Sequence, residues 1–311
     1  MRSLLKAVIT LALVVVAGVG LYIAADPERR AIDQTVRGST SGQFVRLTDG
    51  YTHYELAGPT TSGRVVVLAA GVSVPYYIWD PTFKALVDAG FRVLRYDYYG
   101  RGYSDRPDLA YTQDDYLRQL QDLLDTLAIR QPIDLAGLSF GGSVVTTFAD
   151  RFPDRVRTLV YVDPAFRTPY AVSALEQWPG AWNYLTAIFE ERWWADRQLD
   201  DFAHPERFPD WPDRYKVQLQ YRGFRRAQRA TSVNNANLDQ GPELKRVGAH
   251  PRPVLAFWGK EDRAVPIEFA STLVEAMPRV KLIEVESAGH LPQWERPDVV
   301  HPLLIAFLGG S

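Results

Sequence analysis

The chain has 311 residues, 46% of them hydrophobic and 23% charged, which is ordinary for a folded enzyme and excludes a disordered or fibrous protein. Its formal net charge of -2, without a block of like charges, argues against a nucleic-acid-binding protein, which would need a basic face. Cysteine is absent, so disulfides, a thiol nucleophile and thiolate metal sites are excluded.

An apolar segment opens the chain. Arg2 and Lys6 precede an uncharged run from Ala7 to Ala25, which as a helix would be about 28 Å long, close to the thickness of the bilayer hydrocarbon. This run is longer than the core of a secretory signal, and Ile23 is a poor residue ahead of a cut after Ala25. We therefore predict a membrane anchor over residues 1–25 with the catalytic domain outside the cytoplasm, since Arg2 and Lys6 favour a cytoplasmic N-terminus. The alternative is a secreted or periplasmic protein after signal cleavage.

The next segments predict a linker and a hairpin. Residues 26–42 are polar and include Arg-Gly-Ser-Thr-Ser-Gly, which favours a short tether. The runs 43–47 and 51–56 alternate in polarity around Asp49-Gly50, which indicates a hairpin at the edge of a sheet. We expect His53 on the surface of that edge strand.

Strands then alternate with helices, the pattern of a parallel sheet covered on both faces. The branched apolar run after Arg64 is typical of a strand buried on both sides. We predict strands over 64–71, 91–96, 133–138, 158–162, 254–258 and 281–285, and helices over 81–89, 113–127, 143–151, 268–277 and 297–308.

The alternation breaks between residues 164 and 245, a segment that holds five of the eight tryptophans. We interpret it as a helical insertion. Most of its aromatic residues would form the insertion's own core, and some would form an apolar wall over the substrate, because binding pockets are lined mainly by apolar and aromatic groups.

Ser139 lies in Gly137-Leu138-Ser139-Phe140-Gly141, between a predicted strand and a predicted helix. Small neighbours permit a strained turn that lifts the serine off the carboxyl end of the sheet. Ser139 is therefore a candidate nucleophile.

Asp262 and His290 follow two later strands, and a serine needs such a base and an orienting acid to become nucleophilic. Glu261 and Asp163 are alternative acids. His290 is the histidine that directly follows a late strand after a glycine, and the histidines at 53, 204, 250 and 301 show no metal-ligand spacing with it. We predict no metal and no cofactor.

The order Ser, Asp, His is that of an α/β hydrolase. From about residue 43 to 308 the chain resembles this superfamily, on the serine motif, Asp97-Tyr98-Tyr99-Gly100-Arg101-Gly102-Tyr103-Ser104, the loop 259–266 and Ala288-Gly289-His290. The resemblance implies an α/β-hydrolase core over 43–163 and 246–311, a mostly parallel sheet, and a helical cap over 164–245.

The resemblance also implies an oxyanion hole formed by the backbone N–H groups of Phe140 and Val72. Many relatives have His-Gly before the second donor, where this chain has Ala70-Gly71. The hole can survive because its donors are backbone groups, but the loop loses the bracing of that histidine.

From these features we predict a serine hydrolase that cleaves small, lipophilic carboxylic esters through an acyl-enzyme on Ser139. The membrane segment and the aromatic insertion favour lipophilic esters. One alternative is a C–C bond or amide hydrolase on the same triad, and another is a non-catalytic binding protein on a hydrolase scaffold.

Overall fold

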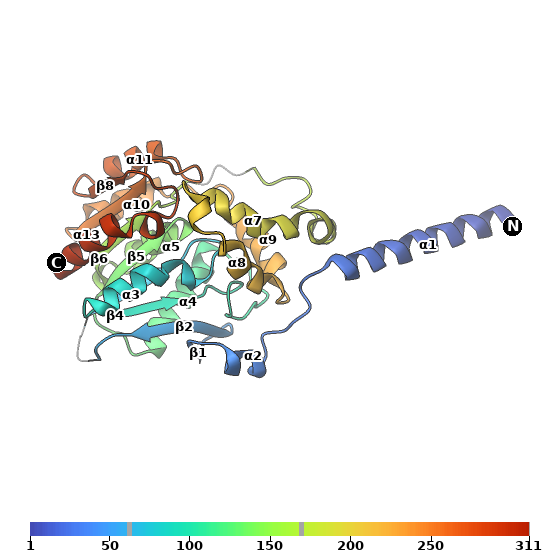
Figure 1. The fold of residues 1–311 in the computed structure, drawn as a ribbon, viewed down its shortest axis with the longest axis horizontal. Helices are drawn as coiled ribbons and strands as arrows, with labels where there is room; N and C mark the ends of the chain where they lie inside the picture. Colours follow the sequence, from blue (N-terminus) through green and yellow to red (C-terminus); the bar gives the residue numbers. More distant parts are fainter. Residues whose placement is uncertain (61–63, 168–170, 311) are drawn as a thin grey trace.

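An eight-stranded sheet forms the centre of the computed structural model, which describes residues 1–60, 64–167 and 171–310 (Figure 1). The strand order is β1-β2-β4-β3-β5-β6-β7-β8. Strand β2 pairs antiparallel with both β1 and β4, and the other neighbouring strands pair parallel. The strands are β1 (Gln43–Arg46), β2 (Tyr51–Ala57), β3 (Val65–Ala69), β4 (Arg92–Tyr96), β5 (Ile133–Leu138), β6 (Val156–Val162), β7 (Val254–Gly259) and β8 (Lys281–Val285).

The central strands are the most apolar part of the fold. Every residue of β3, β5 and β7 is buried, as expected for parallel strands covered on both faces. The predicted α/β-hydrolase architecture is thus confirmed. Because the parallel strands run the same way, the loops after β3, β5, β6, β7 and β8 meet at one edge of the sheet, where sites form in such folds.

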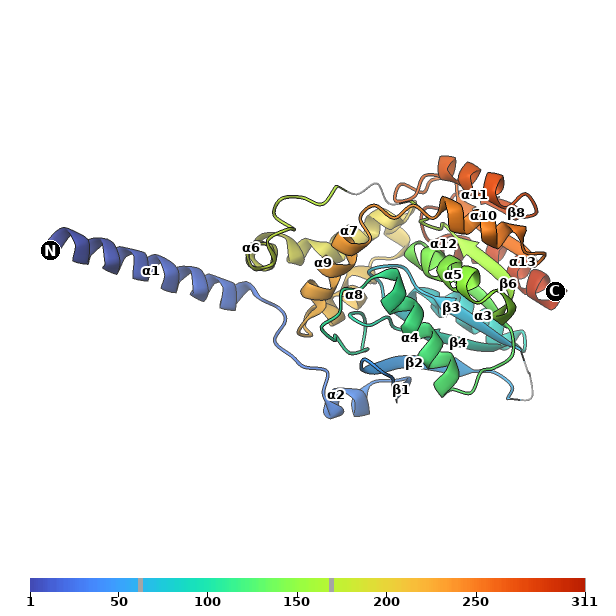
Figure 2. The same ribbon diagram turned by 180° about the vertical axis from the view of Figure 1, so that it is seen from behind.

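Helices cover both faces (Figures 1 and 2). On one face lie α4 (Gln113–Thr126), α5 (Phe140–Arg151), α10 (Gly241–Ala249) and α11 (Ala270–Ala276), and on the other lie α3 (Asp80–Asp88), α12 (Pro292–Glu295) and α13 (Pro297–Gly309). In α4, Leu117, Leu120 and Leu124 recur at helical spacing and are buried. A capping box between Thr112 and Asp115 fixes where α4 begins.

The insertion forms a helical cap over the carboxyl edge of the sheet. Its elements are α6 (Pro179–Leu185), η3 (Thr186–Glu190), α7 (Glu191–Arg197), η4 (Gln198–Asp201), η5 (Pro205–Arg207), α8 (Trp211–Leu219) and α9 (Phe224–Asn234). Residues 168–170 of the insertion lie outside the described residues. The expected second boundary, at residue 245, falls inside α10, which packs on α5. The core therefore resumes near Gly241, where Gly-Pro begins the helix.

The N-terminal segment projects from the cap side of the molecule (Figures 1 and 2). Helix α1 (Arg2–Ala25) has no buried residue and, among the described residues, is the one helix long and apolar enough to cross a membrane. A signal sequence would share this length and composition.

The polar segment 26–42 is more than a tether. It contains α2 (Gln34–Ser39), whose N-terminus is capped by the Asp33 side chain. Arg30 exchanges backbone hydrogen bonds with the cap, its N–H donating to Gln220 and its carbonyl accepting from Arg222. The predicted tether is therefore bound to the cap, because the polarity of a short segment does not show which groups its backbone will reach.

Candidate active site

Ser139 occupies the turn between β5 and α5. Its backbone is strained, with φ 53° and ψ -122°, a conformation that costs free energy unless neighbouring structure enforces it. Glycine is required on both sides. A Cβ at Gly137 would lie 2.4 Å from the Gly141 carbonyl oxygen, and one at Gly141 would lie 2.4 Å from that of Ala69. The turn therefore presents Ser139 at the carboxyl edge of the sheet, as its motif predicts.

His290 and Asp262 come together in the loops after β8 and β7. His290 Nδ1 lies 2.7 Å from Asp262 Oδ2, and Asp262 Oδ1 accepts hydrogen bonds from the backbone N–H groups of Ala264 and Val265. Burial alone would lower the pKa of His290, but the hydrogen bond and charge of Asp262, with the nearby Asp201, raise it above its ordinary value. Asp262 thus lies where an orienting acid belongs, whereas Glu261 is exposed.

Asp163, the other alternative acid, lies directly behind this pair at the end of β6. One carboxylate oxygen each of Asp163 and Asp262 and one ring nitrogen of His290 lie within 4.8 Å of one another. Asp163 Oδ1 accepts a hydrogen bond of 2.8 Å from Gly259 N–H. Burial raises the pKa of Asp163 well above its ordinary value, and the charge of Asp262 adds to the rise. Burial therefore favours the neutral form of the Asp163 carboxyl group.

A cavity of about 220 Å³ lies beside Ser139. Its lining combines the core residues Val72, Ser139 and Phe140 with residues of the insertion, which are Ala165, Thr231, Ser232, Asn235 and Ala236. Val72 and Phe140, the expected oxyanion donors, thus share one cavity with the serine. Among the described residues, Ser139 Oγ makes no hydrogen bond to His290. Such contacts in ligand-free enzymes often tighten when substrate binds.

Arg101 braces the loop that carries Val72. This side chain is buried, its Nε donates to the Val72 carbonyl at 2.5 Å, and Nη2 donates to Thr231 Oγ1 at 3.2 Å. In the described part of the chain it forms no ion pair, and a buried unpaired charge is costly. From the cap, Gln218 Nε2 donates to the next carbonyl, that of Ser73. Arg101 and Gln218 together thus hold the loop that lacks the usual histidine.

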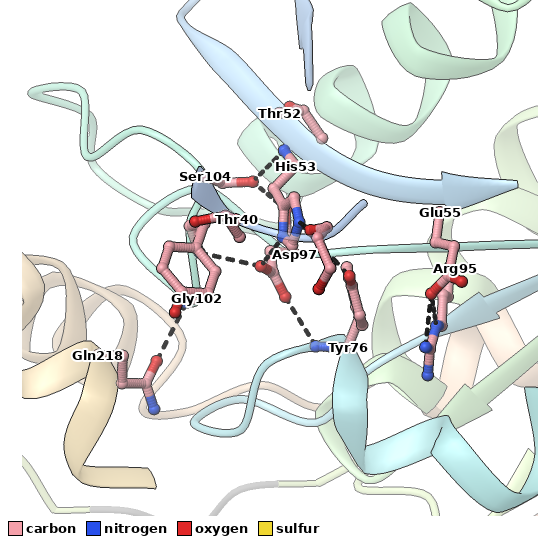
Figure 3. Close-up of polar contacts among 12 residues, drawn as sticks. Thr40, Thr52, His53, Glu55, Tyr76, Arg95, Asp97, Gly102, Ser104 and Gln218 are labelled. Atoms are coloured by element: carbon pink, nitrogen blue, oxygen red, sulfur yellow. Dashed lines mark hydrogen bonds and ion pairs between the residues drawn. The ribbon is translucent and has the colours of Figure 1, made fainter. Parts of the chain in front are cut away.

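His53 is buried, not exposed as expected. Strand β2 lies inside the sheet between β1 and β4, and His53 is only 2% exposed. Its Nδ1 lies 2.7 Å from Asp97 Oδ2 and its Nε2 lies 2.7 Å from the Ser41 carbonyl oxygen (Figure 3). Because each ring nitrogen lies within hydrogen-bond distance of an acceptor oxygen, neither nitrogen of this second His–Asp pair is free to accept a proton from substrate.

Asp97 organises the glycine-rich motif that follows β4 (Figure 3). Besides His53, its carboxylate accepts the backbone N–H groups of Tyr76 and Tyr103. Gly102 has φ 49°, and a Cβ there would lie 2.0 Å from Asp97 Oδ2. Gln218 Oε1 accepts a hydrogen bond from Gly102 N–H. The motif is therefore a structural brace between the sheet, the Val72 loop and the cap.

Glu295 joins the His290 loop to the cap. Its buried carboxylate accepts the N–H groups of Gly289, at 2.6 Å, and of the cap residues Ala203 and His204, at 3.2 and 2.8 Å. In addition, His290 N–H donates to the Asp201 carbonyl at 2.7 Å. The loop that carries His290 is thus attached to the segment after η4.

A family model described as the alpha/beta hydrolase fold matches residues 64–297. The chain belongs to the α/β-hydrolase family. Its sequence is 31% identical over 223 residues to 2-hydroxymuconate semialdehyde hydrolase of Pseudomonas putida, which covers 70% of this chain and 76% of the relative. It is 25% identical over 292 residues to 2-hydroxy-6-oxononadienedioate/2-hydroxy-6-oxononatrienedioate hydrolase 1 of Dechloromonas aromatica (strain RCB), covering 88% and 98% of the two chains.

Among solved structures, the enol-lactonase from Burkholderia xenovorans LB400 superposes with a TM-score of 0.73 at 24% identity, covering 86% of this chain and 100% of the other. This likeness concerns the fold. Together with the family model and the sequence relatives, it makes the protein a hydrolase of the α/β-hydrolase fold.

The sequence analysis did not predict the contacts that three residues make at this site. Asp163 was considered as an alternative acid and not as a neighbour of the acid, and Arg101 and Glu295 were not singled out. Arg101 lies inside the Asp97–Ser104 motif, so the motif marks its position as one to inspect. Nothing in the spacing of the motif shows that the Arg101 side chain reaches Val72. Glu295 follows His290 by five residues and has no sequence signal of its own.

Proposed function

We propose that this α/β hydrolase breaks a bond next to a carbonyl group through an acyl-enzyme on Ser139. One observation carries the proposal. The buried His290–Asp262 pair follows β8 and β7 at the same sheet edge where the strained turn after β5 presents Ser139. A base with an orienting acid and a serine beside a cavity are the parts that nucleophilic acyl transfer needs.

In the proposed reaction, His290 takes the proton of Ser139 as Oγ adds to the carbonyl carbon. The N–H groups of Val72 and Phe140 stabilise the oxyanion, and the charge of Asp262 stabilises the imidazolium. The bond to the leaving group then breaks, and the leaving atom takes its electron pair and the proton from His290. Water, deprotonated by His290, attacks the acyl-serine and releases a carboxylic acid, and the proton returns to Ser139.

The first substrate class that we propose is a 2-hydroxy-6-oxo-dienoate or a related semialdehyde, which differs from the ester predicted from sequence. The two relatives are named as hydrolases of such compounds. These molecules contain neither an ester nor an amide, so their hydrolysis must break a C–C bond. The 2-hydroxy-dienoate must first tautomerise, with its C2 hydroxyl becoming a ketone and a proton adding to C5. Cleavage of the C5–C6 bond then leaves the electron pair on C5, where it is stabilised as a dienolate conjugated with the C2 ketone.

A carboxylic ester of an uncharged acid is the second candidate. It is favoured by the lining of the cavity beside Ser139, since none of the eight lining residues of the described chain is charged. An acyl group in this cavity would therefore be apolar or neutral. We also propose that α1 is retained as a membrane anchor, with the catalytic domain outside the cytoplasm.

The test compares a dienoate with p-nitrophenyl esters of graded chain length, using the native chain and Ser139→Ala. We expect Ser139→Ala to keep its fold and lose turnover by a factor of about 10³ or more. An organophosphonate should label the native chain and the matched variant Ser271→Ala, whose serine lies on the exposed helix α11, but not Ser139→Ala.

Undiminished turnover in Ser139→Ala would exclude the serine mechanism. An unlabelled native chain without activity would favour a binding scaffold. If the native chain hydrolyses the esters and leaves the dienoate intact, the ester candidate replaces the C–C candidate.

A further inference from the structure

Exposed aromatic side chains gather on one part of the cap. Outside α1, the large apolar side chains most exposed in the described chain include Trp178 at 71%, Phe189 at 56% and Trp193 at 48%. Together with Leu185, they fall within α6, η3, α7 and the residue before α6. An apolar patch of this kind on a soluble surface marks an interaction site.

This patch adjoins the end of α1. Tyr184 of α6 donates a hydrogen bond from its hydroxyl to the Gly18 carbonyl at 2.9 Å, and its ring stacks on Tyr22 with centroids 5.7 Å apart. A Cβ at Gly18 would lie 3.1 Å from the Tyr184 hydroxyl, so glycine allows this close approach. In both ribbon views α6 lies beside the end of α1, and the rest of α1 extends away from the body (Figures 1 and 2).

Polar contacts fix α1 against the cap. Arg29 donates to the carbonyl groups of Ile23 and Ala24 at the end of α1, where a helix has unsatisfied acceptors. The Glu28 carboxylate accepts the N–H groups of Gly223 and Arg225 at the start of α9. Arg225 also pairs with Asp26 at 3.1 Å. The direction of α1 relative to the cap is thus set by several contacts, not by a loose linker.

The depth of the contact identifies the partner. If α1 spans a bilayer up to Ala25, Tyr22 lies about 5 Å and Gly18 about 11 Å inside the end of the span, at 1.5 Å per residue. Tyr22 is then near the interfacial level, where tryptophan and tyrosine concentrate in membrane proteins, and Gly18 is at about the depth that the apolar faces of interfacial helices reach. The same junction contains a cavity of about 390 Å³ between Ala25 and Pro27 on one side and cap residues such as Ile188 on the other.

We propose that the aromatic face of the cap, formed by Trp178, Leu185, Phe189 and Trp193, docks on the lipid bilayer that α1 crosses. The proposal rests on the retention of α1 as an anchor and not on the reaction at Ser139. The cap that lines the Ser139 cavity through α9 would then face the membrane, so lipophilic substrate would reach the cap from the bilayer and not only from water.

The experiment uses the full chain in phosphatidylcholine vesicles with and without brominated acyl chains, which quench nearby tryptophan. Helix α1 contains no tryptophan, so quenching reports on the body of the protein. We expect quenching of the native emission and loss of most of it in Trp178→Phe/Trp193→Phe, which keeps the surface apolar. Phe269→Ala/Val274→Ala, which alters exposed apolar residues in the η6–α11 region, should be quenched as the native chain is.

Flotation of the vesicles checks the anchor separately. A chain that floats but shows no bromine quenching would overturn docking and leave α1 as an anchor with the cap in water. Equal quenching in the native chain and the double tryptophan variant would also overturn the proposal. A chain that does not float contradicts both the anchor and the docking. None of these outcomes bears on the reaction proposed at Ser139, which ester and dienoate turnover test separately.

Discussion

Two carboxyl groups, Asp163 and Asp262, share the space behind His290. Asp262 contacts the imidazole, and burial raises the pKa of Asp163. Two charged carboxylates here would repel each other in a site from which water is largely excluded. Asp163 also holds the loop after β7, because its Oδ1 accepts a hydrogen bond from Gly259 N–H.

This arrangement predicts a pH dependence of stability. Unfolded Asp163 loses its proton near pH 4, whereas the folded group keeps it, so folding takes up a proton above that pH. The stabilising contribution of Asp163 to the free energy of unfolding is fully present below about pH 4. As pH rises from there toward the raised folded pKa, this contribution is lost at about 1.4 kcal/mol per pH unit. In Asp163→Asn this component of the slope should vanish. Urea unfolding between pH 4 and pH 8 measures it.

Asp163→Ala is the matched variant for this prediction. In Asp163→Asn the side-chain amide oxygen can still accept the Gly259 N–H, whereas the methyl group in Asp163→Ala cannot. Asp163→Ala should therefore be less stable than Asp163→Asn at every pH in the series. A native slope that persists unchanged in Asp163→Asn would show that Asp163 is ionised in the folded protein.

Single residues were predictable where a motif ties chemistry to chain order. Ser139, Asp262 and His290 follow strands in the order typical of the family, and the structure places the last two in contact. Their catalytic roles stay a prediction. Arg101 was not predictable, because its role depends on a contact with Val72 across the loop. His53 was placed wrongly, because the sequence does not show that Phe44, Tyr76 and Tyr103 pack around its ring.

At the scale of elements, the attachment of the His290 loop to the cap depends on Glu295. Its carboxylate receives three backbone N–H groups, one from the loop and two from the cap. Charge-assisted hydrogen bonds are stronger than neutral ones. In Glu295→Gln one acceptor oxygen becomes a donor, so at least one of these N–H groups loses its partner.

We expect Glu295→Gln to lower the free energy of unfolding by about 2 kcal/mol and to reduce kcat, because the base is held less firmly. Urea unfolding and the rate of organophosphonate labelling of Ser139 measure the two effects. Glu286→Gln is the control, since Glu286 lies in the same loop but is exposed and paired with Lys260. Equal behaviour of the two variants would refute the role of Glu295.

Elements were predictable in the core and less so in the cap. The branched apolar runs place β3, β5 and β7 within a residue or two, because buried parallel strands need such residues on both faces. The cap helices are short and separated by 3₁₀ and π turns, so no long hydrophobic period marks them. For the same reason the boundary at residue 245 was placed inside α10.

At the scale of the whole molecule, α1 decides where the protein acts. If it is an anchor, intact mass of the mature chain from its native host should include residues 1–25 after processing of the initiator Met, and the chain should stay in the membrane fraction through an alkaline wash. A mature chain that begins after Ala25 and is found in the soluble fraction would instead support the signal-peptide alternative.

The segment between α1 and the core differs most from expectation at this scale. Its composition predicted a short tether, but Glu28 and Arg30 bind the cap. Polar groups in a short segment can form hydrogen bonds either with water or with a nearby protein surface. The sequence alone does not show which of the two they reach. Hydrogen bonds therefore connect the cap to α1 and to Glu28 and Arg30 of the segment that follows it.

The Glu295 carboxylate connects the cap to the loop that carries His290. A cap that moves away to admit substrate must pull residues 201–204 from the loop that carries His290, and the base then loses the contacts that position it. The open protein would then bind substrate without reacting. Loading and bond cleavage would thus follow one another in time, with closure of the cap as the event that arms the base.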